Sequence, residues 1–224
     1  MRTFLRVAYE IARKDLVLEV RSKRVLNTAV VFALLVVVVF AFGFAQSFVD
    51  LGTVGSGALW IAFVFAGTFG VVQGAAVEDE DGALDGLLLA PVDRSAVYVG
   101  KVASSTVFVT GVALLTLAFV GVFLDYSPTV ATLPALVGVV VAASFGFSAA
   151  GVVLALLTVK SRIRELLLPM LLVPLVVPVL LAGISLTRRL GTAEPLASWV
   201  VLLLAYDGVL FLAGFATFDY VVEG

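Results

Sequence analysis

Six long apolar runs, each close to the length that crosses a bilayer, constrain this chain more than any other feature. About 20 helical residues at 1.5 Å rise each span the hydrocarbon of a membrane. With 62% apolar and only 13% charged residues, a soluble core could not hide so much apolar surface. The sequence therefore predicts an all-α, multi-pass protein of the cell membrane with six transmembrane helices. The runs cover approximately Val25–Val49, Ala58–Val77, Val97–Leu124, Val130–Val159, Leu166–Leu186 and Leu196–Phe218.

The first 24 residues form a separate basic segment that holds seven of the fourteen lysine and arginine residues. Its apolar residues, from Phe4 to Leu16, recur largely at helical spacing. Such a helix lies in the membrane interface, with its arginines attracted to anionic lipid rather than to nucleic acid. We predict an interfacial amphipathic helix over residues 1–24 and a transmembrane domain over residues 25–224. The alternative is a charge cluster that only sets the topology.

The distribution of positive charge predicts the orientation of the chain. The N-terminal segment, residues 78–101 after the second run, and the Lys160–Glu165 loop together carry twelve lysine and arginine residues. The loops on the opposite side carry only Arg188 and Arg189. Because cytoplasmic loops are enriched in lysine and arginine, both termini and the connector are expected on the cytoplasmic side.

The connector, a predicted coupling segment over residues 78–96, opens with a dense acidic cluster. Three leucines then recur at i, i+3 and i+4, which predicts a short amphipathic helix ending at Pro91. A helix this short is marginal alone in water, so its leucines should rest on another surface. We interpret it as a docking helix for a soluble partner, the alternative being a solvated loop whose leucines touch lipid headgroups. The docking candidates are Glu78, Asp79, Glu80, Asp81, Leu84, Asp85, Leu87 and Leu88.

Two spans carry unusual residues that mark intramembrane functional candidates. The fifth has Pro169, Pro174 and Pro178, each of which removes a helical hydrogen bond and favours a kink. Such a helix either lines a pathway or makes a static bend for packing. The sixth has Asp207 near its midpoint, where an aspartate costs about 2.5–3.5 kcal/mol on insertion scales. It marks a pathway or an intersubunit contact, or else it is a carboxyl hydrogen-bonded inside the bundle.

Small residues repeat every four positions in the second and fourth spans. Such stripes allow close approach of helix backbones where lipid offers no hydrophobic drive between helices. Packing within the bundle is favoured over a dedicated dimer seam. The repeat of the second span starts at Ala58. The packing candidates are Ala62, Ala66, Gly70 and Gly74 in the second span, and Gly138, Ala142, Gly146 and Ala150 in the fourth.

Catalytic and metal-binding patterns are missing from the sequence. There is no histidine or cysteine, which excludes disulfides, thiolate chemistry and imidazole ligation within this chain. Gly100-Lys101 lacks the upstream glycine of a phosphate-binding loop. Tyr206-Asp207 is similar to the pair of intramembrane aspartyl proteases, but no second span has a central acid to share the chemistry. We therefore expect a non-catalytic protein without a metal or cofactor of its own.

Three segments together resemble one family of membrane proteins. They are KDL at Lys14–Leu16, EDGALDGLLLAPVDRSAVYVGK at Glu80–Lys101 and LLLPMLLVPLVVPVLLA at Leu166–Ala182. With the six spans and the YDGVLF run at Tyr206–Phe211, they resemble the CcmB family, often called haem exporter protein B, over nearly the whole chain.

The resemblance implies a fold like that of type 2 ABC exporters and a role in cytochrome c maturation. The family's members pair with a soluble ATPase subunit, similar to CcmA, and act beside a haem-handling membrane subunit, similar to CcmC. The resemblance implies that ATP is hydrolysed in the partner and that this chain couples hydrolysis to the release or export of haem or a haem-loaded chaperone. Haem is then cargo rather than a bound cofactor.

Other functions and assemblies remain compatible with the architecture. One is a permease subunit of a general exporter for a lipid or drug, and another is a non-transporting membrane scaffold. A homodimer is the alternative to pairing with a different membrane subunit.

Overall fold

The computed structural model describes residues 2–46, 48–80, 93–158, 161 and 163–223, and these residues are largely helical. Six of the helices contain stretches long and apolar enough to cross a membrane. This confirms the predicted all-α protein with six candidate spans. In the described residues the helices are α1 (Arg2–Ser22), α2 (Arg24–Phe44), α3 (Leu51–Glu80), α5 (Arg94–Leu124), α6 (Leu133–Thr158), α7 (Arg164–Arg189) and α8 (Ala197–Glu223).

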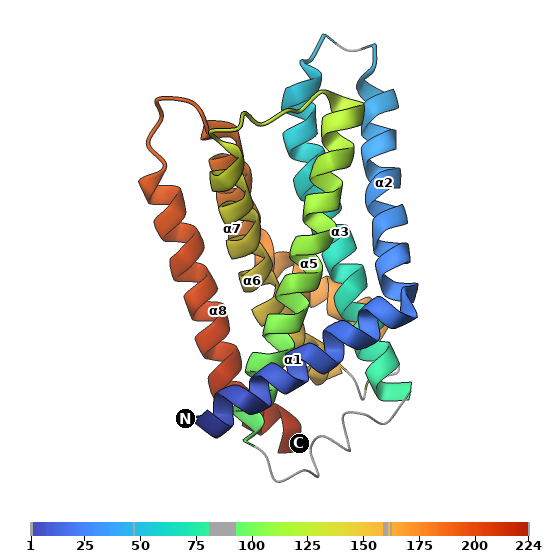
Figure 1. Cartoon of the computed structure of the whole chain (residues 1–224), viewed down its shortest axis with the longest axis vertical. Coiled ribbons are helices and arrows are strands. Elements are labelled where there is room, and N and C mark those ends of the chain that lie inside the picture. Colours follow the sequence, from blue (N-terminus) through green and yellow to red (C-terminus); the bar gives the residue numbers. More distant parts are fainter. Residues whose placement is uncertain (1, 47, 81–92, 159–160, 162, 224) are drawn as a thin grey trace.

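The six spanning helices run side by side and alternate in direction (Figure 1). Both termini lie near one end of the bundle, and the loops that join α2 to α3, α5 to α6 and α7 to α8 lie at the other end. Arg188 and Arg189, at the end of α7, are therefore on the side opposite the basic N-terminal helix. Among the described residues the predicted separation of charges is present, and the assignment of one end to the cytoplasm stays a prediction.

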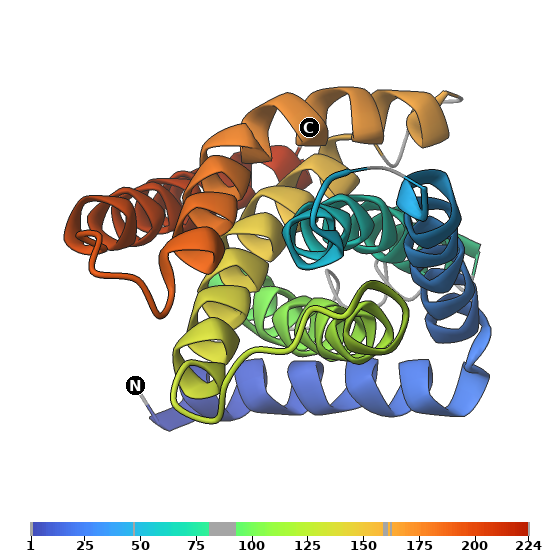
Figure 2. The same ribbon diagram turned by 90° about the horizontal axis from the view of Figure 1, so that it is seen from above.

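Helix α1 lies on the outside of the bundle, crosswise to the spans (Figure 2). Ala8 and Ile11 of this helix, about one turn apart, are buried on the face that packs against the bundle. Leu5 and Tyr9 are 60% and 64% exposed although they are apolar or aromatic. A helix with one face on the bundle and another apolar face exposed fits the predicted position beside lipid headgroups, which itself stays a prediction.

In the interior, aromatic side chains of α3 pack against glycines and aromatic rings of the neighbouring helices. The Trp60 indole Nε1 donates a 3.0 Å hydrogen bond to the hydroxyl of Thr187 in α7. A Cβ atom at Gly183 would collide with the Trp60 ring, so glycine is needed for this approach. Phe63 packs edge-on against Phe147 of α6, with ring centroids 5.5 Å apart. These contacts fix α3 against both α6 and α7.

The small residues of the α3 stripe lie inside the bundle as far as the structure describes them. Ala62 and Ala66 pack in a buried cluster with Ala29 and Ala33 of α2. A Cβ at Gly70 would collide with the Phe108 ring of α5. The stripe therefore lets α2 and α5 approach α3 closely. Ala58 is buried as well, whereas the surroundings of Gly74 lie outside the described side chains.

The stripe of α6 is divided between the interior and the surface. Gly146 and Ala150 are buried and Ala142 is half-buried. Gly138 is exposed, and a Cβ there would meet no atom within 4 Å. Only part of this stripe therefore contributes to packing within one chain.

The orientation of the bundle gives a testable prediction, and the natural absence of cysteine makes it simple to measure. We expect Thr192→Cys, in the exposed α7–α8 loop, to react with a membrane-impermeant maleimide in spheroplasts. Glu10→Cys, in α1 at the opposite end, should react only after the membrane is permeabilised. The reverse pattern of labelling would invert the topology and place the connector outside the cytoplasm.

Candidate functional site

The predicted docking segment is described only at its two edges. Asp81, Leu84, Asp85, Leu87 and Leu88 lie outside the described residues. Glu78, Asp79 and Glu80 form the last turn of α3, and their side chains are not described. The docking assignment of these eight residues therefore stays a prediction.

Two long helices extend into the predicted segment, one from each side. Helix α3 continues past Val77 to Glu80, because glutamate is a good helix former and no glycine or proline intervenes before Gly82. Helix α5 begins at Arg94 rather than Val97. Its start is set by Asp93, whose carboxylate accepts a 3.0 Å hydrogen bond from the backbone N–H of Ser95. The predicted coupling segment 78–96 thus includes the ends of two long helices.

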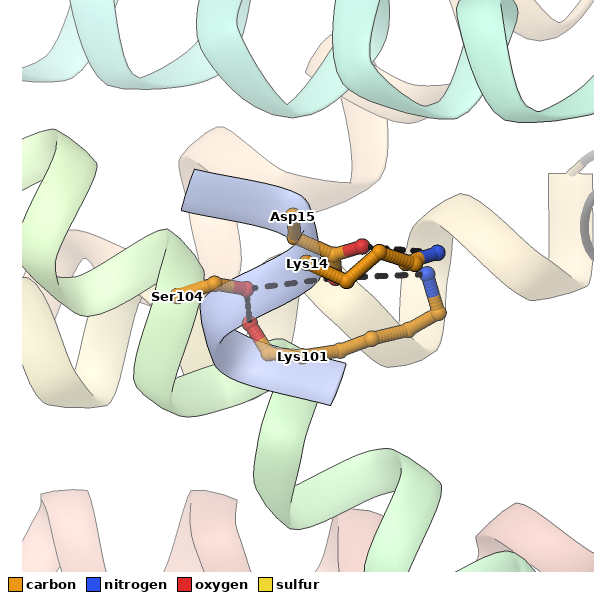
Figure 3. Close-up of polar contacts among 4 residues, drawn as sticks. All are labelled: Lys14, Asp15, Lys101 and Ser104. Atoms are coloured by element: carbon orange, nitrogen blue, oxygen red, sulfur yellow. Dashed lines mark hydrogen bonds and ion pairs between the residues drawn. The ribbon is translucent and has the colours of Figure 1, made fainter. Parts of the chain in front are cut away.

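The first turns of α5 hold a polar joint to α1, which we call the α1–α5 joint and define as Lys14, Asp15, Lys101 and Ser104 (Figure 3). The Lys101 ammonium lies 3.9 Å from the Asp15 carboxylate, and their side chains are only 8% and 16% exposed. Lys14 lies on the other Asp15 oxygen at 2.9 Å. The Ser104 hydroxyl donates to the Lys101 carbonyl at 2.9 Å and also lies 3.4 Å from Asp15. Because burial weakens solvent screening, this pair holds α1 more firmly than an exposed pair would.

Close backbone contact accompanies the joint. A Cβ atom at Gly100 would lie 2.7 Å from the carbonyl oxygen of Ala8 and 2.9 Å from Cβ of Ile11. Any larger residue would push α1 away from α5. Gly100 and Lys101 end the motif Glu80–Lys101, and Lys14 and Asp15 begin the KDL motif. The fold therefore brings together two motifs that lie far apart in the sequence.

Tyr98 joins the same turns of α5 to the rest of the bundle. Its ring is fully buried, and its hydroxyl donates to the Ala149 carbonyl of α6 at 3.1 Å. The Phe211 carbonyl of α8 lies 3.4 Å from the same hydroxyl. A Cβ at Gly214 of α8 would collide with that hydroxyl, so glycine makes room for it. The chain emerging from the connector therefore contacts α1, α6 and α8 within about two turns.

Sequence reasoning assigned no role to Tyr98, to the Lys101–Asp15 pair or to Ser104. One signal was available: Lys101 is a cation inside an apolar span and needs an anion nearby. Asp15 lies 86 positions earlier in the chain, so only the fold shows that the two meet.

Asp207 lies in the interior between α8 and two neighbours. Its side chain is 3% exposed, and neither carboxyl oxygen has a hydrogen-bond partner among the described residues. Gly146 of α6 faces it so closely that a Cβ would collide with the carboxyl, and Val179 of α7 borders the same position. The adjacent Tyr206 hydroxyl donates to the Leu175 carbonyl of α7 at 3.0 Å.

The three prolines lie within one continuous helix, α7, which arches across the bundle in Figure 2. Pro174 is exposed, while Pro169 and Pro178 are half-buried. The Tyr206 bond to Leu175 falls in the turn before Pro178, where a neighbouring helix supplies a donor near the proline. The described geometry places the prolines along a packed, curved helix.

No group of three or more Asp, Glu, His or Cys residues that could hold a metal ion occurs in the part of the chain that the structure describes. Met170, a weak ligand for haem iron, is 74% exposed on α7. The described site is thus a set of helix-to-helix contacts around the first turns of α5. These contacts belong to a multi-pass helical membrane protein in which α5 runs from one end of the bundle to the other.

Comparison with known proteins identifies the family. The CcmB protein family matches residues 6–222, and the chain belongs to it. Heme exporter protein B of Rhodobacter capsulatus is 33% identical over 179 residues, covering 79% of this chain and 80% of the relative. Heme exporter protein B of Paracoccus denitrificans is 31% identical over 204 residues, covering 91% and 93%. These matches confirm the resemblance found in the sequence.

The α1–α5 joint predicts a measurable difference between two ion pairs of α1. Lys101→Ala should lower the free energy of unfolding in mild detergent by roughly 1–3 kcal/mol, because the Asp15 carboxylate stays largely buried with one cation fewer. Arg13→Ala removes an exposed 3.9 Å pair with Glu10 and should cost less than about 1 kcal/mol.

The charge exchange Asp15→Lys with Lys101→Asp should recover part of the stability lost by either reversal alone. Equal effects of Lys101→Ala and Arg13→Ala would show that the buried pair is no stronger than an exposed one.

Proposed function

We propose that this chain is the membrane (permease) subunit of an ABC-type complex for haem handling in cytochrome c maturation. A separate ATPase hydrolyses ATP, and this chain couples hydrolysis to the release or export of haem or a haem-loaded chaperone. Membership of the CcmB family supports the proposal, as do two relatives that carry the name Heme exporter protein B. The chain itself is non-catalytic.

The contacts at the start of α5 carry the mechanical part of the proposal. The connector leucines insert into a groove on the ATPase, and the flanking acids face basic residues there. Closure of the ATPase then displaces the connector and, with it, the first turns of α5. Lys101 passes this displacement to α1, and Tyr98 passes it to α6 and α8. The observation that supports this route most is the convergence of these helices within the stretch from Tyr98 to Ser104.

Haem is handled as cargo of the complex rather than as a cofactor of this chain. The sequence has neither histidine nor cysteine to bind haem iron axially, and Met170 faces outward. A coupling role needs no such ligand, because the partner similar to CcmC holds the haem. Movement of the bundle then acts on that partner.

Docking through the connector is tested by replacing Leu84, Leu87 and Leu88 with serine. Each leucine contributes roughly 1.5 kcal/mol on burial, so losing three should weaken ATPase binding by about a thousandfold. Affinity purification in mild detergent should then recover the membrane protein without an ATPase.

The matched control carries Val130→Ser and Leu133→Ser, two exposed apolar residues at the opposite end of the bundle. It should retain the ATPase. Full recovery of the ATPase by the leucine variant would remove the docking model while leaving the family assignment untouched.

Cargo is tested by deleting the gene in its own host and measuring covalently bound haem in c-type cytochromes. We expect these cytochromes to be lost, other exported substrates to be unaffected, and the wild-type gene to restore them. Normal c-type cytochromes with a defect in lipid or drug export would favour a general exporter. Restoration by the leucine variant, which lacks the ATPase, would favour a scaffold.

A further inference from the structure

A buried carboxyl without a partner is the feature that neither the family nor the coupling route explains. Asp207 lies ten residues into α8, about 15 Å along the helix axis from its start. It is almost completely enclosed by protein, and both of its oxygens lack a hydrogen bond to any described residue. Four buried hydroxyls, of Thr68, Thr110, Ser144 and Ser148, also lack a hydrogen-bond partner among the described residues. Unlike a carboxyl, however, these hydroxyls stay neutral.

As far as the structure describes them, the neighbouring helices present no cation to this carboxyl. Gly146 faces it from α6, and α6 has no Asp, Glu, Lys or Arg anywhere between Leu133 and Thr158. Val179 of α7 lies beside the same face of Gly146, and the charged residues of α7 lie in its first and last turns. The charged residues of α8 itself, Asp219 and Glu223, also lie at its far end.

Two tyrosines and the lysine of α5 are engaged with other groups. Tyr206 donates its hydroxyl proton to the Leu175 carbonyl, and Tyr98 of α5 donates to Ala149. Lys101 of α5 lies at the α1–α5 joint beside Asp15. In the part of the chain that the structure describes, no hydrogen bond or ion pair therefore neutralises an ionised Asp207.

An ionised carboxylate in such a site loses its hydration and has no opposite charge or hydrogen bond to compensate. The neutral acid is therefore the stable form. We propose that Asp207 is an intramembrane proton-binding site. The carboxyl holds its proton while Gly146 packs against it, and releases the proton to water only when α6 and α8 separate. In the coupling route, which is the proposed function, Tyr98 contacts both helices and is placed to cause that separation.

Infrared spectroscopy of the full-length protein in lipid vesicles tests the protonation directly. We expect the carbonyl band of a protonated carboxylic acid at a pH where exposed carboxyls are ionised, with a shift in heavy water. The band should disappear in Asp207→Asn. Glu19→Gln is the matched control, because burial raises the pKa of Glu19, and it should retain the band.

Carbon-13 labelling of aspartate in the unaltered protein keeps this test independent of any variant's folding. The protonated band should move with the label. If labelling aspartate moves only ionised carboxylate bands, Asp207 is charged and the proposal is wrong. This result would leave ATPase docking and haem handling unaffected, so the two failures are distinguishable.

The packing that closes the site is tested by a pair of glycine substitutions in α6. Gly146→Ala should lower the melting temperature, because its Cβ collides with the carboxyl, whereas Gly138→Ala enters open space and should not. Adding Asp207→Ala to Gly146→Ala should raise the melting temperature again. Equal melting temperatures for the two single glycine variants would show that Gly146 does not enclose Asp207.

Discussion

Lipid offers no hydrogen bonds, so a polar group inside a membrane-spanning bundle is costly unless it finds a partner within the protein. Three of the hydrogen bonds between helices show how this constraint is met. Trp60 reaches Thr187, Tyr98 reaches Ala149, and Tyr206 reaches the carbonyl of Leu175. Together they join α3 to α7, α5 to α6, and α8 to α7. Since apolar packing alone tolerates sliding between helices, these bonds fix the relative register of the bundle.

Glycine is the structural complement of these polar side chains. Gly183 leaves space for the Trp60 ring, and Gly214 for the Tyr98 hydroxyl. Gly146 does the same for Asp207. Each large or polar group can approach a neighbouring backbone only because that position lacks a Cβ. The first two of these contacts have a hydrogen bond beside them, and Asp207 differs because it has none among the described residues.

The spans and the exceptional residues were predictable from sequence, because both depend on local chemistry. The length of an apolar run can be counted directly in the sequence, and an acid such as Asp207 stands out in that run whatever surrounds it in space. Helices α3 and α5 extend beyond the apolar runs, and the start of α5 is set by the capping contact of Asp93 rather than by the apolar pattern. The Lys101–Asp15 pair was not predicted, since the partner of a buried charge depends on which helices become neighbours.

The coupling that we propose depends most directly on α1 and the first turns of α5 moving as one unit. A cysteine pair at Asp15 and Ser104, whose polar atoms lie 3.4 Å apart, measures this in native membranes. We predict rapid disulfide formation under mild oxidation, and none for Arg13→Cys with Ser104→Cys, because Arg13 is exposed on α1. Equal cross-linking of both pairs, or of neither, would contradict a fixed joint between these helices.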